Sequence, residues 1–159
     1  VEVSLTDDSV RVRNQGPQKP LPLPLRAAFG IGARDDFVDD WTTRFSPVHS
    51  IYDQYWLSPE GERRTSSFRI FVFFTPADDA TTDLFTFVYA TRPRWTYAIS
   101  PLAKRLSLGL VDLEVRRDQA AIARLAAHER SLAGALGRFD RALVESRKRL
   151  ERIYLGLGR

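Results

Sequence analysis

Asp118 is the residue whose place in the sequence most strongly suggests a functional role, because its carboxylate interrupts an apolar stripe. Apolar residues recur at spacings of three and four along this segment, which predicts a helix with one apolar stripe. The stripe consists of Leu108, Val111, Val115, Asp118, Ile122 and Leu125. A carboxylate on the buried face of a helix is costly unless it meets a cation, a metal ion or hydrogen-bond donors. We therefore expect Asp118 to point inward, toward a metal or an arginine such as Arg69, or to lie at the wet edge of the stripe.

Other groups that bind metals or act as nucleophiles are few. The chain has no cysteine, which excludes disulfides, thiolate catalysis and any zinc or iron–sulfur site built on Cys. Its two histidines, His49 and His128, are far apart in the sequence. The acids at positions 35, 36, 39 and 40 lack the glycine and the distal glutamate of a calcium loop, so they predict a solvated turn.

A pocket for an apolar ligand is a second candidate site. We expect strands at 41–57, 68–75 and 84–91, and a mixture of aromatic and polar side chains on them suits a pocket wall with a few polar anchors. The same mixture suits a partly wet sheet face. The candidate lining residues are His49, Tyr52, Trp56, Phe71, Phe73, Phe87 and Tyr89.

The strand at 68–75 is the centre of the predicted sheet. It holds four phenylalanines, and turn-forming residues at 58–62 and 76–80 separate it from its neighbours. These features predict a three-stranded antiparallel meander over 41–91. We expect its central strand to be interior, with Ile70, Val72 and Phe74 mostly buried.

The remaining segments predict an α+β domain in which an antiparallel sheet wraps a long C-terminal helix, the helix-grip arrangement. Residues 1–40 predict an N-terminal hairpin followed by an extended, proline-rich strap over 15–25. Residues 102–155 predict C-terminal helices, the last of them at about 139–155 and amphipathic. This segment can hold an incomplete version of that fold, and we expect it to be part of a longer chain.

Length and composition set the broad class. The 159 residues suit a single domain, and 43% apolar with 28% charged residues is ordinary for a globular protein. The net charge of +4 is concentrated in the C-terminal helices, where interspersed acids favour a solvated helix face over a nucleic-acid site. No apolar run is long enough to span a membrane, so we expect a cytoplasmic protein. Because the chain has no methionine, we expect that it begins inside a longer polypeptide, as its C-terminal part, or that it has lost its N-terminus.

The segment from about Trp41 to Leu125 resembles the C-terminal catalytic domain of Rieske-type oxygenases, which has a START-like helix-grip fold. In that family a strand ends in a Thr-Pro-x-Asp turn, as at 75–78 here, and the next strand is aromatic, as at 85–88. The following helix carries a carboxylate that completes a mononuclear iron site with two histidines. The helix at 115–122 is similar, and Asp118 falls where that carboxylate would lie.

The resemblance implies cofactors that this chain does not hold. A Rieske 2Fe-2S cluster needs two cysteines and two histidines, and the Fe(II) site needs a close histidine pair, so both would lie upstream of Val1. We therefore expect no cofactor in this chain and no catalysis by the chain alone. The implied partners are a hydrophobic small molecule and the upstream Rieske domain of the same polypeptide or of oligomer neighbours. Two other functions stay open: a non-catalytic helix-grip domain that binds a hydrophobic small molecule, and a structural or docking module.

Overall fold

The structure, a computed structural model, describes residues 1–78, 81–95, 100–126, 140–154 and 156. It divides into two compact units, Val1–Pro93 with Phe139–Arg159, and Arg94–Arg138. Each unit is described by itself below.

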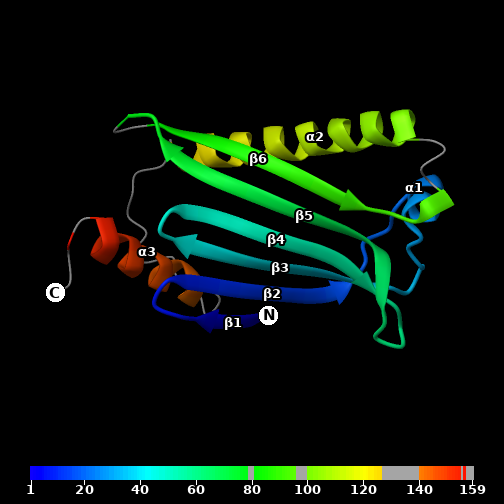
Figure 1. The fold of residues 1–159 in the computed structure, drawn as a ribbon, viewed down its shortest axis with the longest axis horizontal. Coiled ribbons are helices and arrows are strands. Elements are labelled where there is room, and N and C mark those ends of the chain that lie inside the picture. The colour runs from blue at the N-terminus through cyan, green and yellow to red at the C-terminus, as the bar shows by residue number, and fades with distance from the viewer. Residues whose placement is uncertain (79–80, 96–99, 127–139, 155, 157–159) are drawn as a thin grey trace. The chain divides into compact units, whose positions relative to one another are not determined.

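Unit 1 is built on one antiparallel sheet. Its six described strands follow one another in chain order, each paired with the next, so the sheet is a simple meander (Figure 1). The strands are β1 (Glu2–Leu5), β2 (Ser9–Pro17), β3 (Asp36–Phe45), β4 (Val48–Leu57), β5 (Arg63–Pro76) and β6 (Thr82–Thr91). Together with its helices the sheet gives the α+β class that the sequence predicts.

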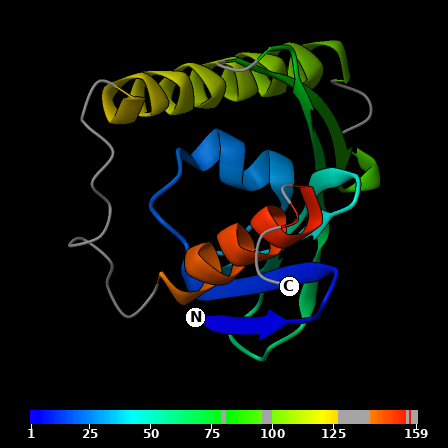
Figure 2. The same cartoon turned by 90° about the vertical axis from the view of Figure 1, so that its left-hand side faces the viewer.

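Two helices lie on the same side of this sheet, α1 (Leu23–Phe29) and α3 (Arg141–Tyr154) (Figure 2). The core lies under α3, where Ala142 and Leu150 pack against the buried side chains of Val10, Val12 and Phe45. Two hydrogen bonds hold the second half of α3 on the sheet, because Arg149 Nε donates to the Thr6 carbonyl at 2.8 Å and the Tyr154 hydroxyl donates to the Phe45 carbonyl at 2.6 Å. The C-terminal helix therefore packs on the sheet through β1, β2 and β3.

The strand register gives the sheet two distinct faces. We call the side that carries α1 and α3 the helix face and the other side the open face. Cross-strand rows alternate between them. One row on the helix face is Val12, Trp41, Tyr52, Ile70 and Val88, and the next row, on the open face, is Arg13, Asp40, Asp53, Arg69 and Tyr89.

Three local predictions need correction. Residues 41–57 are not one strand but the end of β3 and the whole of β4, because the chain reverses at Ser46–Pro47. The acids at 36, 39 and 40 belong to β3 rather than to a solvated turn, and Asp35 beside them is only 1% exposed. Part of the proline-rich strap is the helix α1, since a proline is tolerated in the first turn, where its missing N–H has no helical partner.

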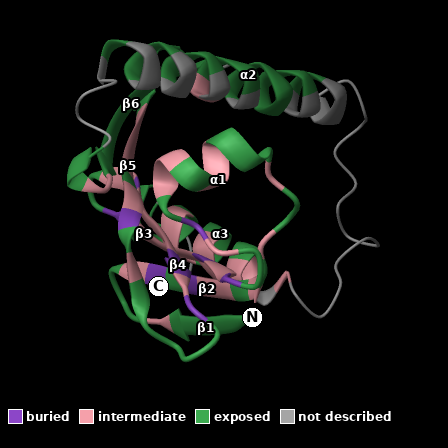
Figure 3. Cartoon of the chain, turned by 90° about the vertical axis from the view of Figure 1, so that its right-hand side faces the viewer, coloured by how far each residue is buried: buried purple, intermediate pink, exposed green. Residues whose placement is uncertain are grey.

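The position of β5 is as predicted, but its burial is not. It lies between β4 and β6, which makes it interior. However, Ile70, Val72 and Phe74 are half-buried, and β6 is exposed along its whole length (Figure 3). The physical reason is that α3 contacts β1, β2 and β3, at the other end of the sheet.

Unit 2 contains the helix α2 (Ser100–Ala126) over the predicted apolar stripe. The stripe was expected to be buried, but Leu108 is 59% and Val115 41% exposed, and Asp118 is exposed as well. A single helix offers nothing to bury a stripe against, so the partner of the stripe and the inward direction of Asp118 stay predictions. None of the described helices is long and apolar enough to cross a membrane.

Candidate functional site

The helix face carries an open pocket of about 590 Å³ between the sheet and the segment that follows β2. We call it the strap groove. Aromatic rings form one wall, where Trp56 contacts Phe37 at 5.4 Å and Phe68 at 6.0 Å between ring centroids. The lining residues are Asn14, Gln15, Gly16, Pro17, Gln18, Lys19, Leu21, Phe37, Asp39, Gln54, Trp56 and Phe68.

The strap is held to the sheet at its first residues. The indole N–H of Trp56, which is 5% exposed, donates a hydrogen bond to Gln18 Oε1. The backbone N–H of Gln18 donates to the Asp35 carbonyl at 3.0 Å. Trp56 thus serves both as part of the aromatic wall and as the attachment point of the opposite wall, so the groove has a defined width there.

A polar row crosses the groove between aromatic pairs. Asn14, Asp39 and Gln54 are cross-strand neighbours on β2, β3 and β4. Gln54 Nε2 donates a hydrogen bond of 3.0 Å to Asp39 Oδ1. Burial raises the pKa of Asp39, the Gln54 hydrogen bond acts against this, and the negative charge of Asp40 adds to it. The groove therefore holds a carboxyl group that takes up a proton more readily than an ordinary aspartate.

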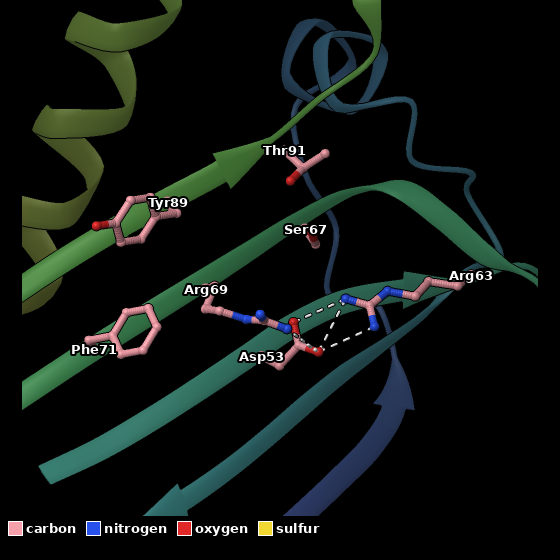
Figure 4. Close-up of a pocket in the computed structure, with 7 residues that line it drawn as sticks. All are labelled: Asp53, Arg63, Ser67, Arg69, Phe71, Tyr89 and Thr91. Atoms are coloured by element: carbon pink, nitrogen blue, oxygen red, sulfur yellow. Dashed lines mark hydrogen bonds and ion pairs between the residues drawn. The ribbon is translucent and has the colours of Figure 1, made fainter.

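A second depression, of about 500 Å³, lies on the open face of β4, β5 and β6 (Figure 4). Its charged groups satisfy one another, because Arg63 donates hydrogen bonds of 3.0–3.2 Å to both Asp53 oxygens and Arg69 lies 3.7 Å from the same carboxylate. Beside them the rings of Phe71 and Tyr89 meet edge to face at 5.8 Å. This is an open, ion-paired surface.

The predicted pocket residues are divided between the two faces. Tyr52 and Trp56 lie on the helix face, and of the seven only Trp56 lines the strap groove. The other five lie on the open face, where Phe71 and Tyr89 line the second depression and Phe73 stacks on His49. The seven residues therefore do not line one pocket. Whether either depression binds a ligand stays a proposal.

Sequence reasoning missed the residues that give the groove its character, Asn14, Phe37, Asp39 and Phe68. A signal for Asp39 was present. Within β3 it alternates with Phe37 and Trp41, which places a carboxylate on an aromatic face once 36–45 is recognised as a strand.

The ligands expected for iron are not gathered in this chain. The described residues contain no group of three His, Cys, Asp or Glu side chains that could hold a metal ion. Asp118 is an exposed carboxylate on α2, His49 Nδ1 donates a hydrogen bond of 2.8 Å to the Pro47 carbonyl, and His128 lies outside the described residues. In the part of the chain that the structure describes, these side chains therefore do not form an iron site by themselves.

Comparison with known proteins gives one match. Neither the curated proteins nor the solved structures gave a match to this chain. The family described as "Vanillate O-demethylase oxygenase C-terminal domain" matches residues 1–155. This match covers nearly the whole chain and agrees with the resemblance to Rieske-type oxygenases that the turn at 75–78 and the helix around Asp118 suggested. The chain belongs to the family of C-terminal domains of vanillate O-demethylase oxygenase, a Rieske-type oxygenase.

Proposed function

We propose that this chain is the substrate-binding part of a Rieske-type oxygenase and that it gives one carboxylate, Asp118, to a mononuclear iron site. The family match over residues 1–155 is the observation that carries the proposal. In this proposal the other iron ligands and the 2Fe-2S cluster belong to an upstream Rieske domain and its neighbouring segments. A 2-His-1-carboxylate site with open positions supplies oxygen chemistry when iron is bound.

The contribution of this chain is to bind and orient the substrate. We propose the strap groove as the site for its apolar part, because Phe37, Trp56 and Phe68 present ring surfaces on which a flat molecule can pack. The polar row of Asn14, Asp39 and Gln54 would fix the orientation of the molecule by hydrogen bonds. We also propose that the domain has the helix-grip fold and that the protein is cytoplasmic.

Metal content and turnover of the intact oxygenase test the role of Asp118. We expect Asp118→Asn to lose mononuclear iron and product formation while the visible spectrum of the 2Fe-2S cluster is unchanged. The matched control is Asp112→Asn, which removes an exposed carboxylate of the same helix that pairs only with Arg116 among the described residues. This control should keep both iron and turnover.

Two results would contradict the proposal. Iron and turnover retained by Asp118→Asn would remove Asp118 from the site. An intact protein that binds hydrophobic small molecules but holds neither iron nor a cluster would favour the alternative, a non-catalytic helix-grip binding domain.

A further inference from the structure

We propose that Arg26 of α1 is an anion-binding residue that holds the carboxylate of an aryl ligand whose ring lies in the strap groove. The inference rests on the proposed function for the role of the groove as a substrate site. It adds the residue that binds the acidic end of the ligand, which neither the family match nor the lining of the groove assigns.

Arg26 has a buried hydrogen-bond donor without an acceptor. Its Nε atom is buried, and no hydrogen-bond partner for it occurs in the part of the chain that the structure describes. The ion pairs found in the same part of the chain do not include Arg26 either, whereas Arg64 nearby is paired with Asp35. A buried N–H without an acceptor is rare in folded proteins and often marks the place of a water molecule or an ion. An anion that accepts from Arg26 would satisfy this group.

The surroundings of Arg26 carry more positive than negative charge. The Arg64 hydrogen bonds are the main cause of the lowered pKa of Asp35, and the charge of Arg26 adds to it, so two arginines share one carboxylate. Arg64 already occupies both oxygens of that carboxylate. Glu60 and Glu62, which also act on Arg64, are exposed in the turn between β4 and β5. A second anion beside Arg26 would therefore balance the charge of this cluster.

Arg26 lies next to the aromatic wall of the strap groove. Its helix, α1, lies on the helix face of the sheet (Figure 2). Arg26 and Phe29 are three residues apart on α1, which places them on the same side of that helix. The ring of Phe29 contacts Phe68, a lining residue, at 5.5 Å between ring centroids, and the Ser66 hydroxyl donates a hydrogen bond to the Phe29 carbonyl. Arg26 is thus at the end of the groove where α1 is attached to β5.

The groove is then polar at both ends and aromatic between them. Asp35, just before β3, alternates with Phe37 and Asp39, and alternate residues of a strand are about 7 Å apart on one face. A benzene ring with groups at opposite positions can pack on Phe37 and Trp56, with its carboxylate at Arg26 and a hydroxyl or ether group at the polar row. The reverse orientation would bring the carboxylate to Asp39, whose negative charge would repel it. Arg26 therefore sets the orientation of the ligand.

Lys19 is a competing candidate for the same role, because it is the cation among the lining residues. Its side chain is exposed, and an exposed ion pair is weak because water solvates both charges. Arg26 is half-buried, and its planar guanidinium can donate two parallel hydrogen bonds to one carboxylate. Burial and geometry both favour Arg26.

Calorimetric titration of the intact protein at neutral pH with 4-methoxybenzoate and 4-methoxybenzamide tests this assignment, because the two probes share their shape and differ in charge at one end. We expect the benzoate to bind about tenfold more tightly, the size of one hydrogen bond to a charged group. Arg26→Gln should weaken the benzoate by about tenfold and leave the benzamide within about twofold, and Arg26→Lys should recover part of the loss. The matched control is Arg34→Gln, the same charge change at an exposed position after α1, which should leave both affinities unchanged.

Several results would overturn the inference: equal affinity for the two probes, a benzoate affinity unchanged in Arg26→Gln, or equal losses of both probes in that variant, which would give Arg26 a structural role. A benzoate affinity that is lost in Lys19→Gln and kept in Arg26→Gln would assign the carboxylate to the lysine. Benzamide binding without a preference for charge would remove only the role of Arg26, whereas no binding of either probe at millimolar concentration would also remove the groove as the substrate site. These readouts do not depend on iron, so the inference can fail while the role of Asp118 stands, or the reverse.

Discussion

Arg64 donates two hydrogen bonds, each 2.9 Å long, to the two carboxylate oxygens of Asp35, which is only 1% exposed. The backbone N–H of Gly32 adds a third, at 2.7 Å to Asp35 Oδ2. The Arg64 hydrogen bonds are the main reason that the pKa of Asp35 is lowered, and they outweigh the opposing effect of burial. This pair ties the loop after α1 to β5, and the same Asp35 holds the strap through its carbonyl.

Removing Arg64 should therefore destabilise the chain. Arg64→Ala leaves Asp35 buried with one hydrogen bond, and we expect a loss of about 2–3 kcal/mol in the free energy of unfolding by urea at pH 7, reduced from the fully buried case because Arg64 is 38% exposed. The matched control is Arg63→Ala, whose partner Asp53 is 26% exposed, and it should cost under about 1 kcal/mol. Equal losses in the two variants would contradict this account.

The sign of the pH dependence follows from the same pair. Because the pKa of Asp35 is lower in the folded chain than its ordinary value of 3.8, the stabilisation is present above that value and is lost as the pH falls through the folded pKa. The difference in stability between wild type and Arg64→Ala should therefore shrink on acidification below 3.8.

Position 32 needs a glycine because the Asp35 carboxylate lies too close to leave room for a Cβ atom, and not because of the backbone angles of Gly32. A Cβ atom at this position would lie 2.5 Å from Asp35 Oδ1, so Gly32→Ala must displace the carboxylate from Arg64. We expect a loss of about 1–3 kcal/mol by chemical denaturation. Gly16→Ala is the control, because its Cβ atom meets nothing within 4 Å, and it should be neutral or stabilising.

The sequence predicted the parts of the fold that rest on local patterns. The alternation of Val10 with Val12 marks β2, and the phenylalanine-rich run at 68–75 marks β5 as interior. It missed the turn at Ser46–Pro47, because aromatic and polar residues continue on both sides of it without a change of pattern. It placed the proline of α1 in an extended strap, although a proline also fits a first helical turn.

The strap groove could not be predicted from the sequence, for a different reason. Asn14, Asp39 and Gln54 come from three strands, and only the register of β2 with β3 and of β3 with β4 brings them into one row. Register is a property of the assembled sheet, since a shift by one residue would send each side chain to the other face. The seven lining residues were predicted from their aromatic or polar side chains alone, and the strand register places them on two opposite faces of the sheet.

The partial burial of Phe74 lowers the loss of folding stability that we expect when this side chain is truncated to alanine. If Phe74 were fully buried, Phe74→Ala would cost about 3–5 kcal/mol. Since Phe74 is half-buried, we expect about 1–2 kcal/mol, whereas Phe45→Ala, at 0% exposure in the core under α3, should cost about 3–5 kcal/mol. Urea titrations of the two variants measure the difference, and a loss as large for Phe74 as for Phe45 would show that β5 is covered in solution.

Asp118→Asn should leave the stability of the isolated chain within about 0.5 kcal/mol of the wild type, because the carboxylate is exposed on α2. Thermal unfolding followed by circular dichroism measures this. A large loss would mean that Asp118 has a stabilising partner in the folded chain, and a clear gain would mean that it carries an uncompensated charge. Neutral stability combined with loss of iron in the intact oxygenase would separate a ligand from a structural residue.

Asp39→Asn should stabilise the chain at neutral pH. The pKa of Asp39 is raised mainly by burial, so the folded chain binds this proton more readily than the unfolded chain. Stability therefore falls as the pH rises from the ordinary value of 3.8 through the raised folded value, and above it the charged carboxylate carries a cost.

Asparagine removes this charge, keeps the oxygen that accepts from Gln54, and also ends the repulsion with Asp40. We expect a melting temperature higher by a few degrees at pH 7 and no difference below pH 3.8, where both side chains are neutral. Asp36→Asn, on the open face of the same strand, is the control and should show no such gain. A variant at position 39 that melts lower than the wild type at pH 7 would mean that the negative charge of the Asp39 carboxylate is compensated in the folded chain.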